Sequence, residues 1–286
     1  MGPELDEYLS GSKLYGEDLG EAEREQWYRD EEEAYAELTG TYGRAYRYEY
    51  HAQNIEHGFR HLAEKEFGRV LGVGSAWGYE FDPILGRCGE ITILDPSQGL
   101  TNPRFRYVRP SPSGVMPFET GSFDLVTCLN VLHHVPNVST YVQEIARVLA
   151  CGGAALITEP IISMGDWRRR RPGATRHERG IPLPLLRSML RDSGLSIARE
   201  HLLHFPVVAA LRHVLRTPPY NARWVVKLDS FLCSLPIWFR TYHAQRWWQK
   251  LRARCVFFVV RKPGTDASFS RPDGSVPCLP QANPPR

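Results

Sequence analysis

Val-Leu-Gly-Val-Gly-Ser-Ala-Trp-Gly-Tyr-Glu, residues 70–80, is the stretch of this sequence that decides the fold. An apolar run leads into a turn containing Gly72, Gly74 and Gly78, and the turn opens a helix. At such a junction the backbone N–H groups and the positive end of the helix face a ligand. The spacing is GxGxxxG, one residue longer than the GxGxxG fingerprint of dinucleotide sites. It favours a nucleoside ligand without a diphosphate and disfavours a nicotinamide oxidoreductase.

A carboxylate follows the next apolar run of the chain. Ile91–Leu94 reads ITIL and ends at Asp95, about twenty residues after the turn. An acid at the end of the second strand is where the two hydroxyl groups of a ribose bind. The alternative is that Asp95 is only a turn residue before Pro96. Together with the glycine turn, its position favours ribose binding.

Short β-rich runs alternate with helical patterns through the middle of the chain. The runs cover residues 69–73, 90–94, 104–108, 123–129 and 154–158, and two later ones cover 195–201 and 255–262. Near-continuous apolar strands that alternate with helices predict an α/β fold, with a doubly wound, mostly parallel sheet covered on both faces. We divide the chain into an N-terminal helical cap (1–66), a Rossmann-like cofactor-binding core (67–204), a helical insert or lid (205–253), a last core strand (254–262) and a proline-rich tail expected to be disordered (263–286).

Composition and charge narrow the class of protein. Of the 286 residues, 42% are hydrophobic, which is enough for a sizeable core. No run of about 18 apolar residues or secretory signal is evident, and the six cysteines include no CxxC pair, so we expect a cytoplasmic protein without a metal site. The formal charge is −10 over residues 1–66 and +15 over residues 160–262. Either the two segments pack together or the basic one binds an anionic partner.

Two further segments carry a resemblance to a known family. Met116–Asn137 reads MPFETGSFDLVTCLNVLHHVPN, and Arg147–Pro160 reads RVLACGGAALITEP. In order and spacing, these motifs resemble those of class I S-adenosylmethionine-dependent methyltransferases, in the branch that reads LPFxxxSFD, LHH and RVLxPGG. The resemblance covers about residues 68–160. It implies a seven-stranded Rossmann-like methyltransferase sheet with N-terminal helices and a helical insert before the last strand, and S-adenosyl-L-methionine as the cofactor.

The resemblance also implies a cofactor site, position by position. Gly74 and Gly78 would line the methionine end, Asp95 would hold the ribose, and Leu129 and Asn130 would lie beside the methionine moiety at the end of the fourth strand. The expected cofactor-binding set is Gly72, Gly74, Ser75, Gly78, Asp95, Pro96, Ser113, Leu129 and Asn130.

Some positions depart from the family pattern. Gly72 stands where the family usually has an acid, and Ala76 where it has a glycine. Pro112 replaces an acid common near the adenine, so we expect Ser111 or Ser113 to bind the adenine instead. These departures motivate an alternative, a catalytically silent binding or scaffold protein that keeps the fold.

Methyl transfer to oxygen or nitrogen needs positioned reactants and, for many acceptors, a base. The candidates are His134 and His133 after the fourth strand, Glu159 at the end of the fifth, and His177 in the RHERG loop. Each has a structural alternative, since a histidine here can simply close a turn and Glu159 can be a capping residue before Pro160.

The insert combines Trp224, Trp238, Trp247 and Trp248 with seven basic residues. It suits a lid over an acceptor pocket, an ordinary cap with buried tryptophans, or peripheral membrane contact, in that order, and nucleic acid is disfavoured. We expect O-methylation of a small or medium acceptor, anionic or lipid-linked if the lid is basic. The resemblance places such enzymes in secondary-metabolite or saccharide biosynthesis. The sequence specifies neither the acceptor nor the oligomeric state.

Overall fold

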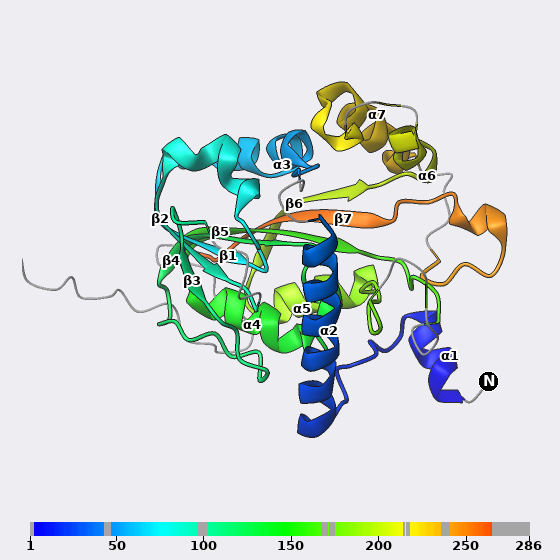
Figure 1. The fold of residues 1–286 in the computed structure, drawn as a ribbon. Helices are drawn as coiled ribbons and strands as arrows, with labels where there is room; N and C mark the ends of the chain where they lie inside the picture. The colour runs from blue at the N-terminus through cyan, green and yellow to red at the C-terminus, as the bar shows by residue number, and fades with distance from the viewer. Residues whose placement is uncertain are drawn as a thin grey trace, which may run out of the picture.

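A seven-stranded sheet forms the centre of the molecule (Figure 1). The structure is a computed structural model that describes residues 3–42, 47–96, 102–166, 171, 175–213, 215, 218–235 and 241–264. The strand order is β3-β2-β1-β4-β5-β7-β6, and β7 runs antiparallel to both its neighbours. The strands are β1 (Phe67–Val73), β2 (Cys88–Leu94), β3 (Arg106–Val108), β4 (Phe123–Leu129), β5 (Leu149–Pro160), β6 (Ser196–Leu203) and β7 (Cys255–Arg261). The predicted α/β, mostly parallel seven-stranded fold is confirmed.

Helices cover both faces of the sheet, as its apolar strands require. On one face α4 (Val138–Val148) and α5 (Leu183–Asp192) pack their buried Ile145 and Leu186 against Val126 and the other strand residues of that face. On the opposite face, Phe81 and Ile84 of the 3-10 helix η3 (Tyr79–Arg87) pack with Leu125 and the residues around it. The helix expected after the glycine turn is therefore a 3-10 helix, with Pro83 inside it.

The N-terminal cap contains α1 (Pro3–Ser10), α2 (Glu21–Tyr42), α3 (His51–His57) and the 3-10 helix η2 (Phe59–His61). In Figure 1, α2 is the long dark-blue helix that stands in front of α4 and α5. Gly58 separates α3 from η2. A Cβ atom there would lie 2.7 Å from the Phe257 ring of β7, so the chain passes very close to the sheet.

The insert is helical but fragmented. It comprises α6 (Pro206–Ala209), η5 (Ala210–His213), η6 (Pro219–Asn221), α7 (Arg223–Ser234) and η7 (Trp247–Lys250). The buried Asp229 carboxylate accepts the N–H groups of His204 and Phe205, 2.8 Å from each, and so joins α7 to the end of β6. Within the described residues, no helix is long and apolar enough to cross a membrane.

Two tryptophans of the insert are largely exposed. Trp224 is 58% exposed and Trp247 72% exposed. The alternative of an ordinary cap with buried tryptophans is therefore wrong for these two residues. Trp238 and the predicted disordered tail from residue 265 onward lie outside the described residues.

Gly78 is the position where the turn after β1 depends most on the absence of a side chain. Its φ is +70°, and a Cβ atom would lie 2.5 Å from the Phe105 ring and 2.9 Å from Ile93 Cδ1. Strain and overpacking should together cost about 1–3 kcal/mol in Gly78→Ala. We expect urea denaturation to show this loss. The control is Gly86→Ala, where nothing lies within 4 Å of the added methyl group. Equal stabilities for the two variants would contradict the prediction.

Candidate functional site

A pocket opens at the carboxyl ends of β1, β2 and β4, which is where open α/β sheets bind ligands. The space between its lining atoms, open solvent included, is about 860 Å³. Helix α2 supplies part of one wall. The lining residues are Tyr28, Glu31, Glu32, Val73, Gly74, Leu94, Asp95, Pro96, Arg109, Pro110, Pro112, Val131, His134, Val135 and Tyr141.

The glycine turn is fastened to the end of β2 by Asp95. The Asp95 Oδ2 atom accepts the N–H of Ala76 at 2.9 Å, and the Gly74 N–H donates to the Leu94 carbonyl at 2.8 Å. Gly74 and Ala76 both have positive φ angles, +63° and +47°. The turn therefore presents its backbone and the mostly buried Asp95 carboxyl group together at the pocket wall.

The predicted cofactor residues divide into two groups. Gly74, Asp95 and Pro96 line the pocket. The other six are not part of its wall: Gly72, Ser75, Gly78, Ser113, Leu129 and Asn130. At four of these positions a sequence neighbour lines the wall: Val73 beside Gly72, Gly74 beside Ser75, Pro112 beside Ser113 and Val131 beside Asn130. Cofactor contact by these six residues stays a prediction.

The glycine at position 72, where the resemblance leads us to expect an acid, has a steric explanation. A Cβ atom at this position would lie 2.3 Å from Ser75 Oγ, so an acid cannot fit unless Ser75 moves.

A different carboxyl group lies beside the turn, that of Glu80, which is 3% exposed. Burial, with a smaller contribution from the neighbouring Asp95 carboxylate, raises the pKa of Glu80 to about 7. Glu80 belongs to the 70–80 stretch, but no sequence pattern marked it as a site residue.

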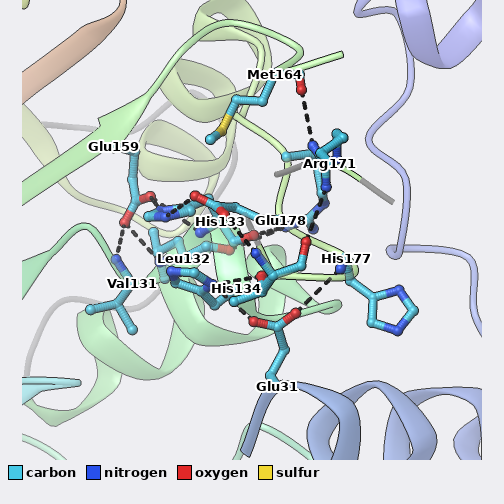
Figure 2. A network of polar contacts seen from close by, with 12 residues as sticks. Glu31, Val131, Leu132, His133, His134, Glu159, Met164, Arg171, His177 and Glu178 are labelled. Atoms are coloured by element: carbon cyan, nitrogen blue, oxygen red, sulfur yellow. Dashed lines mark hydrogen bonds and ion pairs between the residues drawn. The ribbon is translucent and has the colours of Figure 1, made fainter. Parts of the chain in front are cut away.

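Glu159 organises the loop that follows β4 (Figure 2). Its carboxylate is fully buried, and Oε1 accepts the N–H groups of Val131 and Leu132 at 2.9 and 2.7 Å. Its Oε2 accepts the N–H of His133 at 3.2 Å and lies 2.8 Å from His133 Nδ1. Glu159 is not part of the pocket wall, so its contacts suit a positioning residue better than a base.

His133 and His134 point to different partners. Burial, together with the neighbouring His134, lowers the pKa of His133, which does not line the pocket. His134 does line it, and its Nδ1 lies 2.9 Å from Glu31 Oε2 on α2. Although burial opposes it, the hydrogen bonds from His134 and Thr175 hold the pKa of Glu31 below its usual value. His134 is thus the one predicted base that lies at the pocket.

His177 belongs to a neighbouring cluster. Its ring stacks on Trp27 with centroids 4.4 Å apart, and its Nε2 lies 2.7 Å from Asp30 Oδ2. His177 is not in the pocket wall, so its predicted catalytic role gains no support from the geometry.

Arg179 holds the same loop from the side opposite Glu159. It is fully buried, which lowers its pKa to about 10. Its guanidinium lies over the Trp27 ring and donates to the carbonyls of Tyr15, Leu132, His133, Val135 and Pro136. The Arg179 side chain therefore links the N-terminal cap to the loop after β4.

Several site residues were missed by the sequence analysis. Tyr28 and Glu31 lie on α2, far from the core in sequence, and Glu178 is adjacent to the selected His177. One ring nitrogen of His133, one of His134 and one oxygen of Glu178 lie within 4.8 Å of one another, a set that could ligate a metal ion. The RHERG motif was the only signal for Glu178, and nothing in the acidic α2 sequence singled out Glu31.

Comparisons with known proteins agree with this geometry. Residues 71–157 match a family model described as a methyltransferase domain. An uncharacterised methyltransferase of Bacillus subtilis, YcgJ, is 29% identical over 104 residues, covering 32% of this chain and 40% of the relative. A ubiquinone biosynthesis O-methyltransferase of Dechloromonas aromatica is 31% identical over 100 residues, covering 32% of this chain and 43% of that protein. The chain thus spans about two fifths of the length of these curated relatives.

One solved structure extends the similarity beyond the matched segment. It is the complex of the Haloferax volcanii Trm112 methyltransferase activator with a methyltransferase. The comparison gives a TM-score of 0.51 and 16% identity, covering 82% of this chain and 97% of that one. At this identity the likeness concerns the fold.

The buried Glu80 should make stability depend on pH. Its pKa in the folded state, about 7, lies above the ordinary 4.5, so between these pH values the folded state binds more protons than the unfolded state. The free energy of unfolding should therefore fall as pH rises through this window, by at most about 3 kcal/mol. We expect Glu80→Gln to remove this part of the pH dependence, measured by urea denaturation at pH 5 and pH 8. Glu90→Gln, at an exposed position of β2, should leave it intact. If the profiles of the wild type and Glu80→Gln run parallel, the predicted protonation is wrong.

Proposed function

We propose that this chain, whose residues 71–157 match a methyltransferase domain, is a class I S-adenosylmethionine-dependent methyltransferase that methylates an oxygen atom of a small or medium-sized acceptor. The observation that carries the proposal is the Asp95 carboxyl group at the pocket wall, tied to a glycine turn at the carboxyl ends of the parallel strands. The domain match covers about a third of the chain, and we assign the methyltransferase activity to the whole chain.

The pocket residues fit S-adenosylmethionine. Asp95 is placed to bind the ribose hydroxyls, and Gly74 lines the same pocket. Leu94, Pro110 and Pro112 offer an apolar wall suited to the adenine ring. The cofactor supplies an electrophilic methyl group, so the protein has only to bind, orient and exclude water, and to accept a proton where the acceptor requires it.

His134 is the group best placed to accept that proton. Ionised Glu31 can only accept hydrogen bonds, so it fixes the proton of His134 on Nδ1 and makes Nε2 the basic nitrogen. The proton of an acceptor hydroxyl would pass to Nε2, and Glu31 would stabilise the resulting imidazolium. Oxygen as the acceptor atom is supported by the relative named for O-methylation. A saccharide or secondary metabolite as the acceptor rests on sequence resemblance alone.

The alternative is a silent scaffold that keeps the fold without binding the cofactor. Gly72 and Pro112, which stand where the family has acids, motivate this alternative, and the steric contact with Ser75 Oγ gives a reason for the first of them. Titration calorimetry with S-adenosylhomocysteine separates the two functions, because a silent scaffold should release no heat of binding.

Asp95 provides the sharpest test of the cofactor site. We expect Asp95→Ala to weaken S-adenosylhomocysteine binding at least about 10-fold, since it removes charge-assisted hydrogen bonds to the ribose. Asp82→Asn is the matched control, because the Asp82 carboxylate is half exposed and is not part of the pocket wall. Calorimetry on both variants gives the comparison. An unchanged affinity in Asp95→Ala would refute the proposed site.

His134→Gln tests the base. With an acceptor found by screening phenols, catechols and sugars, kcat should fall by about 10²–10⁴-fold while the affinity for S-adenosylhomocysteine stays the same. His177→Gln should keep most of the activity. A His134→Gln enzyme as fast as the wild type would exclude His134 as the base.

A further inference from the structure

Three metal-ligating side chains meet beside the pocket. His133 and His134 come from the 3-10 helix η4 (Leu132–His134), and Glu178 comes from the loop before α5. Figure 2 shows the three side chains gathered between Glu159 on one side and Glu31 on the other. Their donor atoms lie within 4.8 Å of one another. Around tetrahedral zinc, donors 2.0–2.1 Å from the ion lie about 3.3 Å apart, so a small side-chain movement would complete a site.

The carboxylates around the histidines fix which ring nitrogens can bind an ion. Ionised Glu159 only accepts hydrogen bonds, and it lies 2.8 Å from His133 Nδ1. The proton of neutral His133 is therefore on Nδ1, and Nε2 carries the lone pair. The 2.9 Å contact between Glu31 and His134 Nδ1 fixes the second ring in the same way.

When His133 is neutral, this arrangement places two hydrogen-bond acceptors opposite each other. His133 Nε2 lies 3.6 Å from Glu178 Oε1, while Glu178 Oε2 accepts the N–H of Thr175 at 3.0 Å. The side chains are 7% and 15% exposed, so little water screens them. A lone pair opposite a carboxylate oxygen is unfavourable in such a place, and a cation between them converts the repulsion into attraction.

The balance of charges around the cluster favours a divalent cation. Three carboxylates surround it, those of Glu31, Glu159 and Glu178. Among the described residues, Arg171 and Arg179 are cations near it. Both donate to backbone carbonyls, Arg171 to that of Met164 and Arg179 to that of His133, and the charge of Arg171 also interacts with Glu178. Glu31 and Glu159 occupy the positions that carboxylates usually take behind metal-bound histidines, where they orient the rings and increase their basicity.

We propose that His133, His134 and Glu178 bind a divalent transition-metal ion such as Zn²⁺ at the acceptor side of the pocket. Two histidines and a glutamate are the protein ligands of one class of catalytic zinc site, which keeps its fourth position open. Because His134 lines the pocket, the open position faces the space where an acceptor oxygen would bind.

The proposal deepens the proposed function, because it makes a metal-coordinating oxygen the acceptor group. Coordinated His134 cannot accept a proton, so the metal and the histidine base are alternatives at one place. Metal binding can be measured without any methyl acceptor, and its failure would leave the cofactor site and the base untouched.

The test is zinc binding by the full-length protein. After treatment with EDTA and removal of the chelator, we expect calorimetry to show one zinc ion per chain, and elemental analysis of the desalted protein to confirm it. Glu178→Gln should weaken binding by more than about 100-fold, and Glu31→Gln, which removes an orienting carboxylate, by about 10–100-fold. Both variants should keep the circular dichroism spectrum of the wild type.

His177→Asn is the matched control, because it removes a histidine from the same loop that is not among the three ligands. It should bind zinc as the wild type does, and Glu178→Gln should still bind S-adenosylhomocysteine. His133→Asn gives a second loss of binding if it folds. The proposal is overturned if the wild type binds no stoichiometric zinc, or if Glu178→Gln binds it as tightly as the wild type.

Discussion

The site depends on one buried carboxylate. Glu159 has no exposed surface, and four N–H groups of a single loop converge on its two oxygens. A buried charge is tolerable only when it is fully hydrogen-bonded, so the loop after β4 has one conformation that satisfies Glu159. That conformation brings Val131 and His134 to the pocket and orients the ring of His133. The place of Glu159 at the end of β5 suggests a catalytic role. Its hydrogen bonds instead make it a positioning residue for the loop that reaches the pocket.

The N-terminal cap is part of the site as well as of the fold. Its Trp27 Nε1 donates to the His134 carbonyl at 2.6 Å, and Glu31 orients the His134 ring. The uneven charge of the sequence has its counterpart here, because acids of the cap pair with bases of the C-terminal third. The pairs are Asp30 with Arg176, Glu56 with Arg223, and Glu64 with Arg261. The exposed members of such pairs add little stability, so the buried contacts around Trp27 matter more.

Local patterns predicted the sheet and one part of the pocket wall. The strand runs, the glycine turn and Asp95 are set by neighbouring residues, and Gly74, Asp95 and Pro96 line the pocket while the other six predicted cofactor residues do not. The part of the pocket wall that α2 supplies was not predicted. Glu31 and His134 are 103 positions apart, and no spacing rule joins an acidic helix to a histidine pair. Topology put Glu159 and His133 near the site, but the direction of a side chain depends on hydrogen bonds that form only in the folded chain.

The family match begins at residue 71 and ends at residue 157. Tyr28, Glu31 and Glu32 contribute to the pocket from before that segment, and Glu178 approaches His133 from after it. The matched segment therefore supplies one part of the cavity wall, and α2 supplies another. The shape of the cavity can consequently change through substitutions in the helix at 21–42, with no substitution in the sheet.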